Sequence, residues 1–184
     1  MQQTRHRLRG ARHLSNEVPC LRMKPLSLVL FLITGIALPA RAQSGDPTLT
    51  QRVISQAGAQ QVLQAAQSAA QKLHAPSAIA VVDSSGILVA FLRMDGVRPG
   101  SPDLAIGKAR TSALLRRPSE ETEDNINKGR TAFVTAGFLT LRGGMPILRH
   151  GEVIGAVGIA GTNKDNDVTI AQTAAAALDV QNQR

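Results

Sequence analysis

The feature that most limits how this chain can build a core is its shortage of large aromatic side chains. The 184 residues include no Trp and no Tyr, and of four Phe only Phe91, Phe133 and Phe138 follow residue 42. The interior must therefore be built from Ala, Val, Leu and Ile. The same shortage removes the stacking platforms that single-stranded nucleic acid needs, so we expect no nucleic-acid partner.

The segment from Met23 to Ala42 has the order of a secretory signal peptide. Met23-Lys24 gives a positive start, residues 26–38 form an apolar run, and Ala40-Arg41-Ala42 has the small-x-small pattern of a cleavage site. The apolar run is shorter than the ~20 residues that a membrane-spanning helix needs. We therefore predict cleavage after Ala42 and a periplasmic or secreted mature chain, 43–184, that is not attached to a membrane. Residues 1–22 are either a leader extension or sequence upstream of a true start at Met23.

Processing changes the meaning of the basic composition. The formal net charge is +8, but seven of the 21 Lys and Arg and one of the 13 Asp and Glu precede Gln43, which leaves 14 minus 12, or +2. The single cysteine, Cys20, also precedes the predicted cleavage point. The mature chain therefore has no means of forming a disulfide or a thioether bond to haem, and any cofactor must be held non-covalently.

Residues 43–184 predict one domain that contains both helices and strands. Thr48 or Thr50 can cap a first helix, and Pro76 marks its end. Residues 77–83 and 87–93 are typical of a β-hairpin. Further helices are expected at 103–115, 119–129 and 168–178, and further strands at 138–141, 146–149 and 152–160. This order favours an α+β fold with a mostly antiparallel sheet.

Five short motifs follow one another along the predicted mature chain. They are Ala80-Val81-Val82-Asp83 with Gly86, Leu92-Arg93-Met94-Asp95-Gly96, Ser101 to Thr111 with Lys108-Ala109-Arg110-Thr111, Gly143-Gly144-Met145-Pro146-Ile147 and Gly155-Ala156-Val157-Gly158-Ile159-Ala160-Gly161. In this order they resemble the GlcG/HbpS haem-binding family. The resemblance implies a profilin-like five-stranded antiparallel sheet flanked by helices. It also implies homo-oligomers, from dimers to octamers, and a haem ligand in secreted members.

Haem requires an apolar slot, an axial ligand and cations for its propionates, and few side chains of the mature chain can serve as the ligand. His74 is interpreted as an exposed residue at a helix end, and Met94 as core filler. His150 is either a solvated turn residue or a ligand that a second copy buries. Met145 follows Gly143 and Gly144, which allow the backbone to approach a ligand closely.

Lys108 and Thr111 are spaced so that their side chains share one helical face. This face can offer a cation and a hydroxyl to a carboxylated ligand, and the resemblance makes Thr111 a candidate haem contact. In the alternative interpretation, Thr111 bonds a backbone carbonyl and Lys108 is a solvated or ion-paired charge. The candidate cofactor-binding residues are thus Thr111, Lys108, Met145, Gly143, Gly144 and His150.

The remaining charged residues favour structural roles. Asp83 and Asp95 sit beside turns, where aspartate bonds its own backbone, and Asp165 and Asp167 place negative charge at a helix start. We expect no metal site. A basic strip either receives propionates or pairs with the acidic segment that follows it; the strip is Arg110, Arg116 and Arg117, and the acids are Glu120, Glu121 and Glu123.

No catalytic motif of a familiar hydrolase or nucleotide-dependent enzyme is present after residue 42. The resemblance to the GlcG/HbpS family, together with the leader, implies an exported, oligomeric haem-binding protein that stores, senses or degrades haem. One alternative is an enzyme or accessory protein that acts on a small carboxylated metabolite in the same pocket without haem. Another is an oligomer with a structural or sensory role and no ligand.

Overall fold

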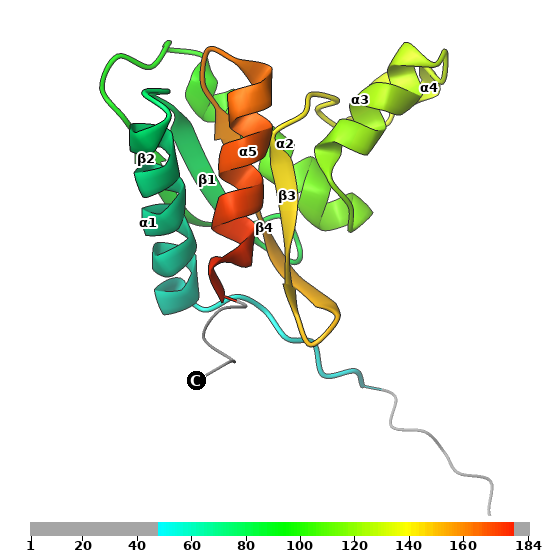
Figure 1. Cartoon of the computed structure of the whole chain (residues 1–184). Helices are drawn as coiled ribbons and strands as arrows, with labels where there is room; N and C mark the ends of the chain where they lie inside the picture. Colours follow the sequence, from blue (N-terminus) through cyan, green and yellow to red (C-terminus); the bar gives the residue numbers. More distant parts are fainter. Residues whose placement is uncertain (1–47, 179–184) are drawn as a thin grey trace, which may run out of the picture. The chain divides into compact units, whose positions relative to one another are not determined.

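The computed structural model describes residues 48–178, and the predicted signal peptide at 23–42 and the extension at 1–22 lie outside them. Four strands form one antiparallel sheet in the order β2-β1-β4-β3. They are β1 (Ala78–Asp83), β2 (Leu88–Arg93), β3 (Gly144–Arg149) and β4 (Glu152–Ala160). The hairpin predicted for the first two strands is confirmed, as is the late strand β4 (Figure 1).

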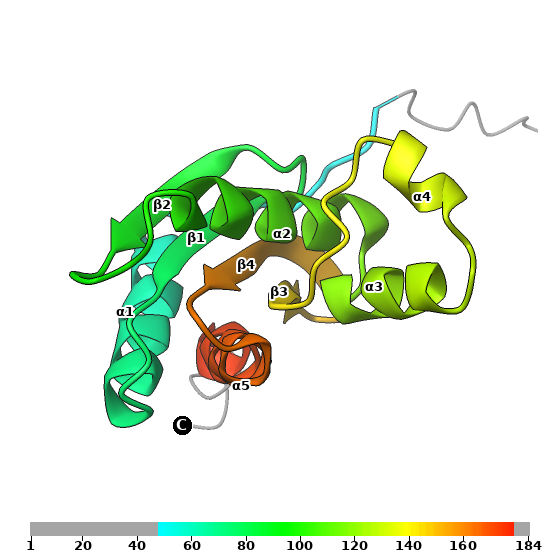
Figure 2. The same ribbon diagram turned by 90° about the horizontal axis from the view of Figure 1, so that it is seen from above.

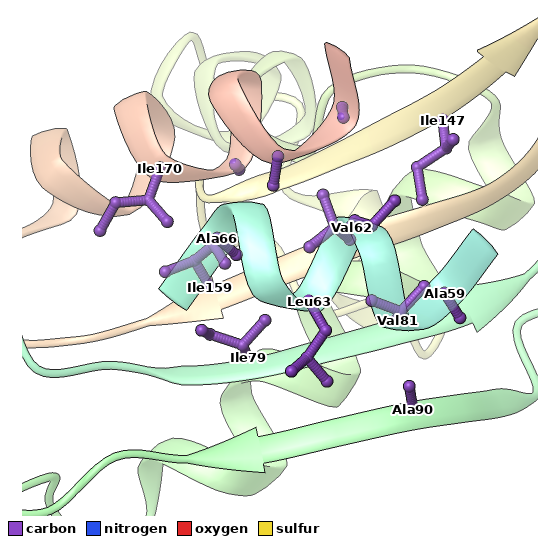
Figure 3. Packing of buried hydrophobic residues seen from close by; sticks show 14 of the residues in the cluster. Ala59, Val62, Leu63, Ala66, Ile79, Val81, Ala90, Ile147, Ile159 and Ile170 are labelled. Carbon is purple, nitrogen blue, oxygen red and sulfur yellow. The ribbon is translucent and has the colours of Figure 1, made fainter. Parts of the chain in front are cut away.

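One face of the sheet is covered by α1 (Gln56–Lys72) and α5 (Lys164–Ala175), and the chain continues from α5 into a short 3-10 turn, η1 (Ala176–Leu178). Figure 2 shows both helices on the same side of the strands. Their apolar stripes meet the sheet in one buried cluster, in which Val62 and Leu63 of α1 lie near Ile79 and Val81 of β1 (Figure 3). Burial of this cluster removes aliphatic surface from water, which is the main force holding these layers together.

The opposite face is covered by α2 (Ser101–Leu115), which packs against β4 and β1 (Figure 2). The contact is made mainly by alanines, among them Ala105 and Ala109 of α2 and Ala156 of β4. A methyl group on Gly158 would collide with the backbone of α2, so this glycine sets how closely the helix approaches the sheet. All buried hydrophobic side chains of the described residues are Ala, Val, Leu or Ile, which confirms the predicted composition of the core.

The first helix begins later than the sequence predicted. Ser55, rather than Thr48 or Thr50, is its N-cap, and its hydroxyl accepts a hydrogen bond from the Gly58 N–H at 3.1 Å. The preceding residues are extended, and the Ile54 N–H donates to the carbonyl oxygen of Ile154 at 2.8 Å. Pairing with the end of the sheet therefore competes with helix formation there. The last helix is capped by Asn163, whose side chain accepts from the N–H groups of Asp165 and Asn166.

The strand predicted at 138–141 is wrong, and the sheet has four strands rather than the predicted five. The segment instead crosses over α2, where the Leu139 carbonyl accepts a hydrogen bond from the Thr111 hydroxyl at 2.9 Å. The Leu141 carbonyl accepts from the Ser119 hydroxyl at 2.7 Å. Helix side chains thus satisfy carbonyls that a neighbouring strand would otherwise pair. Phe138 and Leu139 are half-buried and Leu141 is exposed, and none of them joins the sheet.

Two further helices, α3 (Ser119–Asn127) and α4 (Ala132–Thr135), extend beyond the end of α2 (Figure 1). The sequence predicted the first and missed the second. Two cations lie over the Phe133 ring of α4, Arg117 at 5.4 Å and Arg130 at 4.9 Å from its centroid. Within residues 48–178, no helix combines the length and apolar character needed to cross a bilayer.

Candidate functional site

A buried ion pair lies where β4 ends. Lys108 of α2 is 4% exposed and Asp167 of α5 is 4% exposed. The Lys108 ammonium donates to an Asp167 carboxylate oxygen at 2.8 Å and to the Ile159 carbonyl at 2.8 Å. The other Asp167 oxygen accepts from the Gly161 N–H at 2.8 Å. Buried charges are tolerated because they are paired and hydrogen-bonded in this way.

The pair forms part of the wall of a cavity of about 220 Å³. The cavity is lined by the loop before α2, α2 itself, α3, the segment before β3, and the stretch from the end of β4 to the start of α5. The lining residues are Arg98, Leu104, Lys108, Glu123, Leu141, Arg142, Ala160, Gly161, Thr162, Lys164 and Asp167. Four of these side chains are cations and two are carboxylates. The lining is therefore positive by two charges.

Two of the cations, Arg98 and Lys164, are exposed at the cavity. The Arg98 guanidinium donates to the Gly161 carbonyl at 2.8 Å, which fixes its position. Lys164 is the first residue of α5, and the positive end of the helix dipole lies at the same place. The electrostatic field here favours an anion.

Arg142 forms the centre of an ionic cluster on another part of the lining. Its guanidinium donates to Glu123, to Glu120 at 3.1 Å and to Asp124 at 3.2 Å. The hydrogen bond to Glu123 is the main reason that the pKa of Arg142 is raised; the charges of all three carboxylates add to the rise and burial opposes it. The cluster ties α3 to the segment before β3.

Gly143 and Gly144 lie directly against Lys108. Gly143 has φ of 108°, and a methyl group there would lie 2.9 Å from the Ile159 carbonyl and 3.2 Å from the Lys108 ammonium. A methyl group on Gly144 would collide with the Lys108 carbonyl, and the Gly144 N–H donates to the Ser119 hydroxyl at 2.8 Å. The sequence interpretation had these glycines bring the backbone close to a ligand, whereas in the structure they bring it close to α2.

Thr111 is 1% exposed, and its hydroxyl donates to the Leu139 carbonyl. The structural interpretation of Thr111 therefore holds in this conformation, because the hydroxyl is covered by the segment that crosses α2. Leu139 also fills the space above Gly107, where an added methyl group would lie 2.7 Å from a Leu139 side-chain carbon. Lys108 is ion-paired, as the alternative interpretation had it, and lines the cavity as well.

The structure separates the remaining predicted site residues from Lys108. Met145 pairs with Val157 and packs against the cluster under α1 and α5, on the other face of the sheet from α2. His150 is exposed in the β3-β4 turn with φ of 52°. His74 is exposed after α1, as predicted, and Met94 packs against both core clusters.

Several charged residues took roles that differ in part from the predictions. Asp83 accepts hydrogen bonds from the N–H groups of Ser85 and Ile87, which confirms its turn role. Asp167 lies in the first turn of α5 as predicted, but its carboxylate serves the buried pair with Lys108. Three acids of α3, Glu120, Glu123 and Asp124, pair with Arg142 rather than with the basic strip. Arg110 instead donates to the Gly86 carbonyl at 3.1 Å.

Sequence reasoning missed Arg98, Arg142 and Lys164 as parts of the cavity. Arg142 precedes the Gly143-Gly144 motif, so its position next to a close backbone approach was a usable signal. Arg98 lies in a loop and Lys164 starts a helix, and neither carries a local pattern that distinguishes it from an ordinary surface cation. Among residues 48–178, no three His, Cys, Asp or Glu side chains gather as a metal site would require.

Comparison with known proteins agrees with this architecture. The family described as "Haem degrading protein HbpS-like" matches residues 54–176, which include all four strands and the whole cavity lining. Protein GlcG of Escherichia coli K12 is 45% identical over 112 residues, which are 60% of this chain and 84% of GlcG.

Two solved structures have the same fold. A double mutant of HbpS from Streptomyces reticuli has a TM-score of 0.66 and 32% identity, and the match covers 77% of this chain and 97% of that one. PduOC, solved as a complex with heme, has a TM-score of 0.62 and 31% identity over 68% of this chain and 94% of its own. With the family match spanning the whole sheet and the helices on both its faces, this chain belongs to the HbpS-like family.

Proposed function

We propose that this chain is an exported haem-binding protein that works as a homo-oligomer. The observation that carries the proposal is the HbpS-like match over residues 54–176, together with the likeness to PduOC, which was solved with heme bound. Storage, sensing and degradation of haem are all compatible with a non-covalently held cofactor. Haem iron, when bound, would supply redox and ligand-exchange chemistry that the side chains lack.

The described residues fit the acidic edge of haem. Its propionates need cations, and the cavity offers Arg98 and Lys164 at its exposed side and Lys108 at depth. A cavity of about 220 Å³ falls below the ~300–1,000 Å³ of pockets that enclose drug-sized ligands, so the porphyrin ring would remain outside it. We propose that a second copy covers the ring, which accounts for the homo-oligomer.

The lining of the cavity contains no His, Cys or Met, so the iron ligand must come from outside the cavity. An apolar groove of about 390 Å³ between α1 and α5 also has no His, Cys or Met in its lining, which consists of Ala65, Ser68, Ala69, Lys72, Leu73, Thr169 and Thr173. The Thr111 hydroxyl is covered, and Met145 is half-buried on the opposite face. His150 and His74 are exposed, so either imidazole can ligate iron without rearranging the core. We place His150 first because it lies at the tip of a hairpin that a second copy can reach.

An absorbance titration with hemin tests the proposal. The processed chain, 43–184, should give a saturable Soret shift, and His150→Ala should change its position or weaken binding if this imidazole is the ligand. His74→Ala, Met145→Ala and Thr111→Ala test the other candidates. A titration no different from that of an unrelated protein would overturn haem binding. It would favour an enzyme or accessory protein for a small carboxylated metabolite, which the cationic cavity also suits.

Export is tested by expressing the chain from Met1 and from Met23 and fractionating the cells. We expect both products in the periplasm or medium, beginning at Gln43 by N-terminal sequencing. Retention of an uncut product in the cytoplasm would contradict the signal-peptide proposal. Sedimentation of the processed protein, with and without hemin, measures the oligomeric state.

A further inference from the structure

We propose that the cavity beside the Lys108-Asp167 pair is a binding site for one carboxylate carried on a short aliphatic arm. The arm can be a propionate of haem or a free short-chain carboxylic acid, and these share the chemistry that the site recognises. The first source deepens the haem proposal and rests on it. The second does not require haem.

The donors for a carboxylate are held in place by the protein. Lys108 has three N–H donors, of which two are used by Ile159 and Asp167, and its side chain lines the cavity. Arg98 has five, and one donates to the Gly161 carbonyl. Each cation therefore has donors left for a ligand while an existing bond fixes its position. Donors fixed in advance lose little conformational entropy when an anion binds.

The balance of charge favours an anion over a cation. Asp167 neutralises Lys108, and Arg142 is occupied by its carboxylate partners. Arg98 and Lys164 have no ion-pair partner among residues 48–178. An incoming carboxylate would meet two cations with uncompensated charge beside the start of α5.

Size and lining limit the ligand to one carboxylate on a short chain. Leu104, Leu141 and Ala160 provide apolar surface for methylene groups. Glu123 shares the lining, and Glu120 and Asp124 join it around Arg142, so a second carboxylate would meet negative charge. The volume of about 220 Å³ accommodates a few carbon atoms beside the acid group.

Butyrate is the probe for the free acid, and butyramide is its uncharged control. We expect saturable shifts of the Gly161 and Thr162 amide signals in ¹H-¹⁵N NMR spectra with butyrate, and none with butyramide. Arg98→Gln should weaken butyrate about tenfold, as loss of a charge-assisted hydrogen bond does. Arg110→Gln is the matched control, because Arg110 also donates to a backbone carbonyl but lies outside the cavity. Lys164→Gln and its control Lys128→Gln extend the test to the second exposed cation.

Hemin and hemin dimethyl ester, whose propionates are blocked, distinguish the two sources. If a propionate occupies the site, the ester and Arg98→Gln should each weaken hemin binding about tenfold, and butyrate should compete with hemin. If the site serves a free acid, butyrate binds as expected and hemin is indifferent to both changes. Either result supports the carboxylate site.

The two proposals can fail separately. Butyrate binding without any hemin binding would retain the carboxylate site and overturn the haem proposal. Hemin binding that is unaffected by esterification and by Arg98→Gln, with no butyrate response, would retain the haem proposal and overturn the carboxylate site.

Discussion

The Lys108 ammonium lies 2.8 Å from the Asp167 carboxylate, and this contact joins two helices that cover opposite faces of the sheet (Figure 2). Lys108 belongs to α2 and Asp167 to the first turn of α5, 59 residues later. Both side chains also bond the backbone where β4 ends. The pair therefore fixes the end of the sheet and one wall of the cavity together.

Lys108→Met should destabilise the fold by about 3–5 kcal/mol, because Asp167 would be left buried without its counter-charge. Urea unfolding followed by circular dichroism measures the effect. The double variant Lys108→Met with Asp167→Leu should recover part of the loss, since no unpaired charge remains. Lys128→Met, at an exposed lysine, should stay within about 0.5 kcal/mol of the parent. A small effect of Lys108→Met would show that the pair is solvated.

Gly144→Ala should destabilise the fold by roughly 1–3 kcal/mol or prevent folding, because its methyl group would collide with the Lys108 carbonyl. Backbone atoms of α2 lack the freedom of a flexible side chain to move aside. Calorimetric melting compares it with Gly100→Ala, where φ is −82° and no atom lies within 4 Å of the added methyl group. Equal melting temperatures for the two variants would contradict the packing role of Gly144.

Thr111→Val keeps the shape of the side chain but removes the hydrogen bond to Leu139, and should cost about 1–2 kcal/mol. Thr173→Val, at an exposed hydroxyl bonded within α5, is the control and should change little. Unfolding and hemin titration are measured on the same samples. If Thr111 serves only structure, stability falls and hemin affinity stays; a fall in affinity alone would make it a ligand contact.

Arg142→Gln should lower stability by about 1–2 kcal/mol at low ionic strength, because three partly exposed carboxylates lose their shared cation. The difference from the parent should shrink in high salt, which screens such charges. Amide hydrogen exchange at residues 137–143 should accelerate, since Arg142 ties this segment to α3. Salt-independent destabilisation would indicate lost packing rather than lost charge.

The raised pKa of Arg142 determines how its contribution to the stability of the fold changes with pH. A cation whose pKa rises on folding stabilises the fold fully below its unfolded-state pKa, and this contribution is lost as pH rises through the folded-state value. The Arg142 guanidinium should therefore stay charged across the neutral and moderately alkaline range. The free energy of unfolding of the parent and of Arg142→Gln is measured at neutral pH and at about pH 10. The difference between the two proteins that is due to Arg142 should be the same at both pH values.

Local patterns in the sequence sufficed for the hairpin around Asp83, the helix that carries Lys108 and the late strand that ends at Ala160. In each, the spacing of apolar residues and the turn residues act over a few positions, so no distant contact is needed to read them. The absence of large aromatics likewise determined an aliphatic core. The ordered motifs also indicated the family to which the chain belongs.

Tertiary structure alone decided which partners these elements have. The segment at 138–141 has the apolar character of a strand, but hydroxyls of Thr111 and Ser119 satisfy its carbonyls and keep it on α2. The cavity likewise needs Arg98, Arg142 and Lys164 from three separate segments, and the partner of Lys108 lies on a helix from the other face of the sheet. Periodicity encodes that a side chain is buried. The atoms it is buried against depend on how distant elements pack in space, so the sequence determined the elements and the aliphatic core, and packing decided the site.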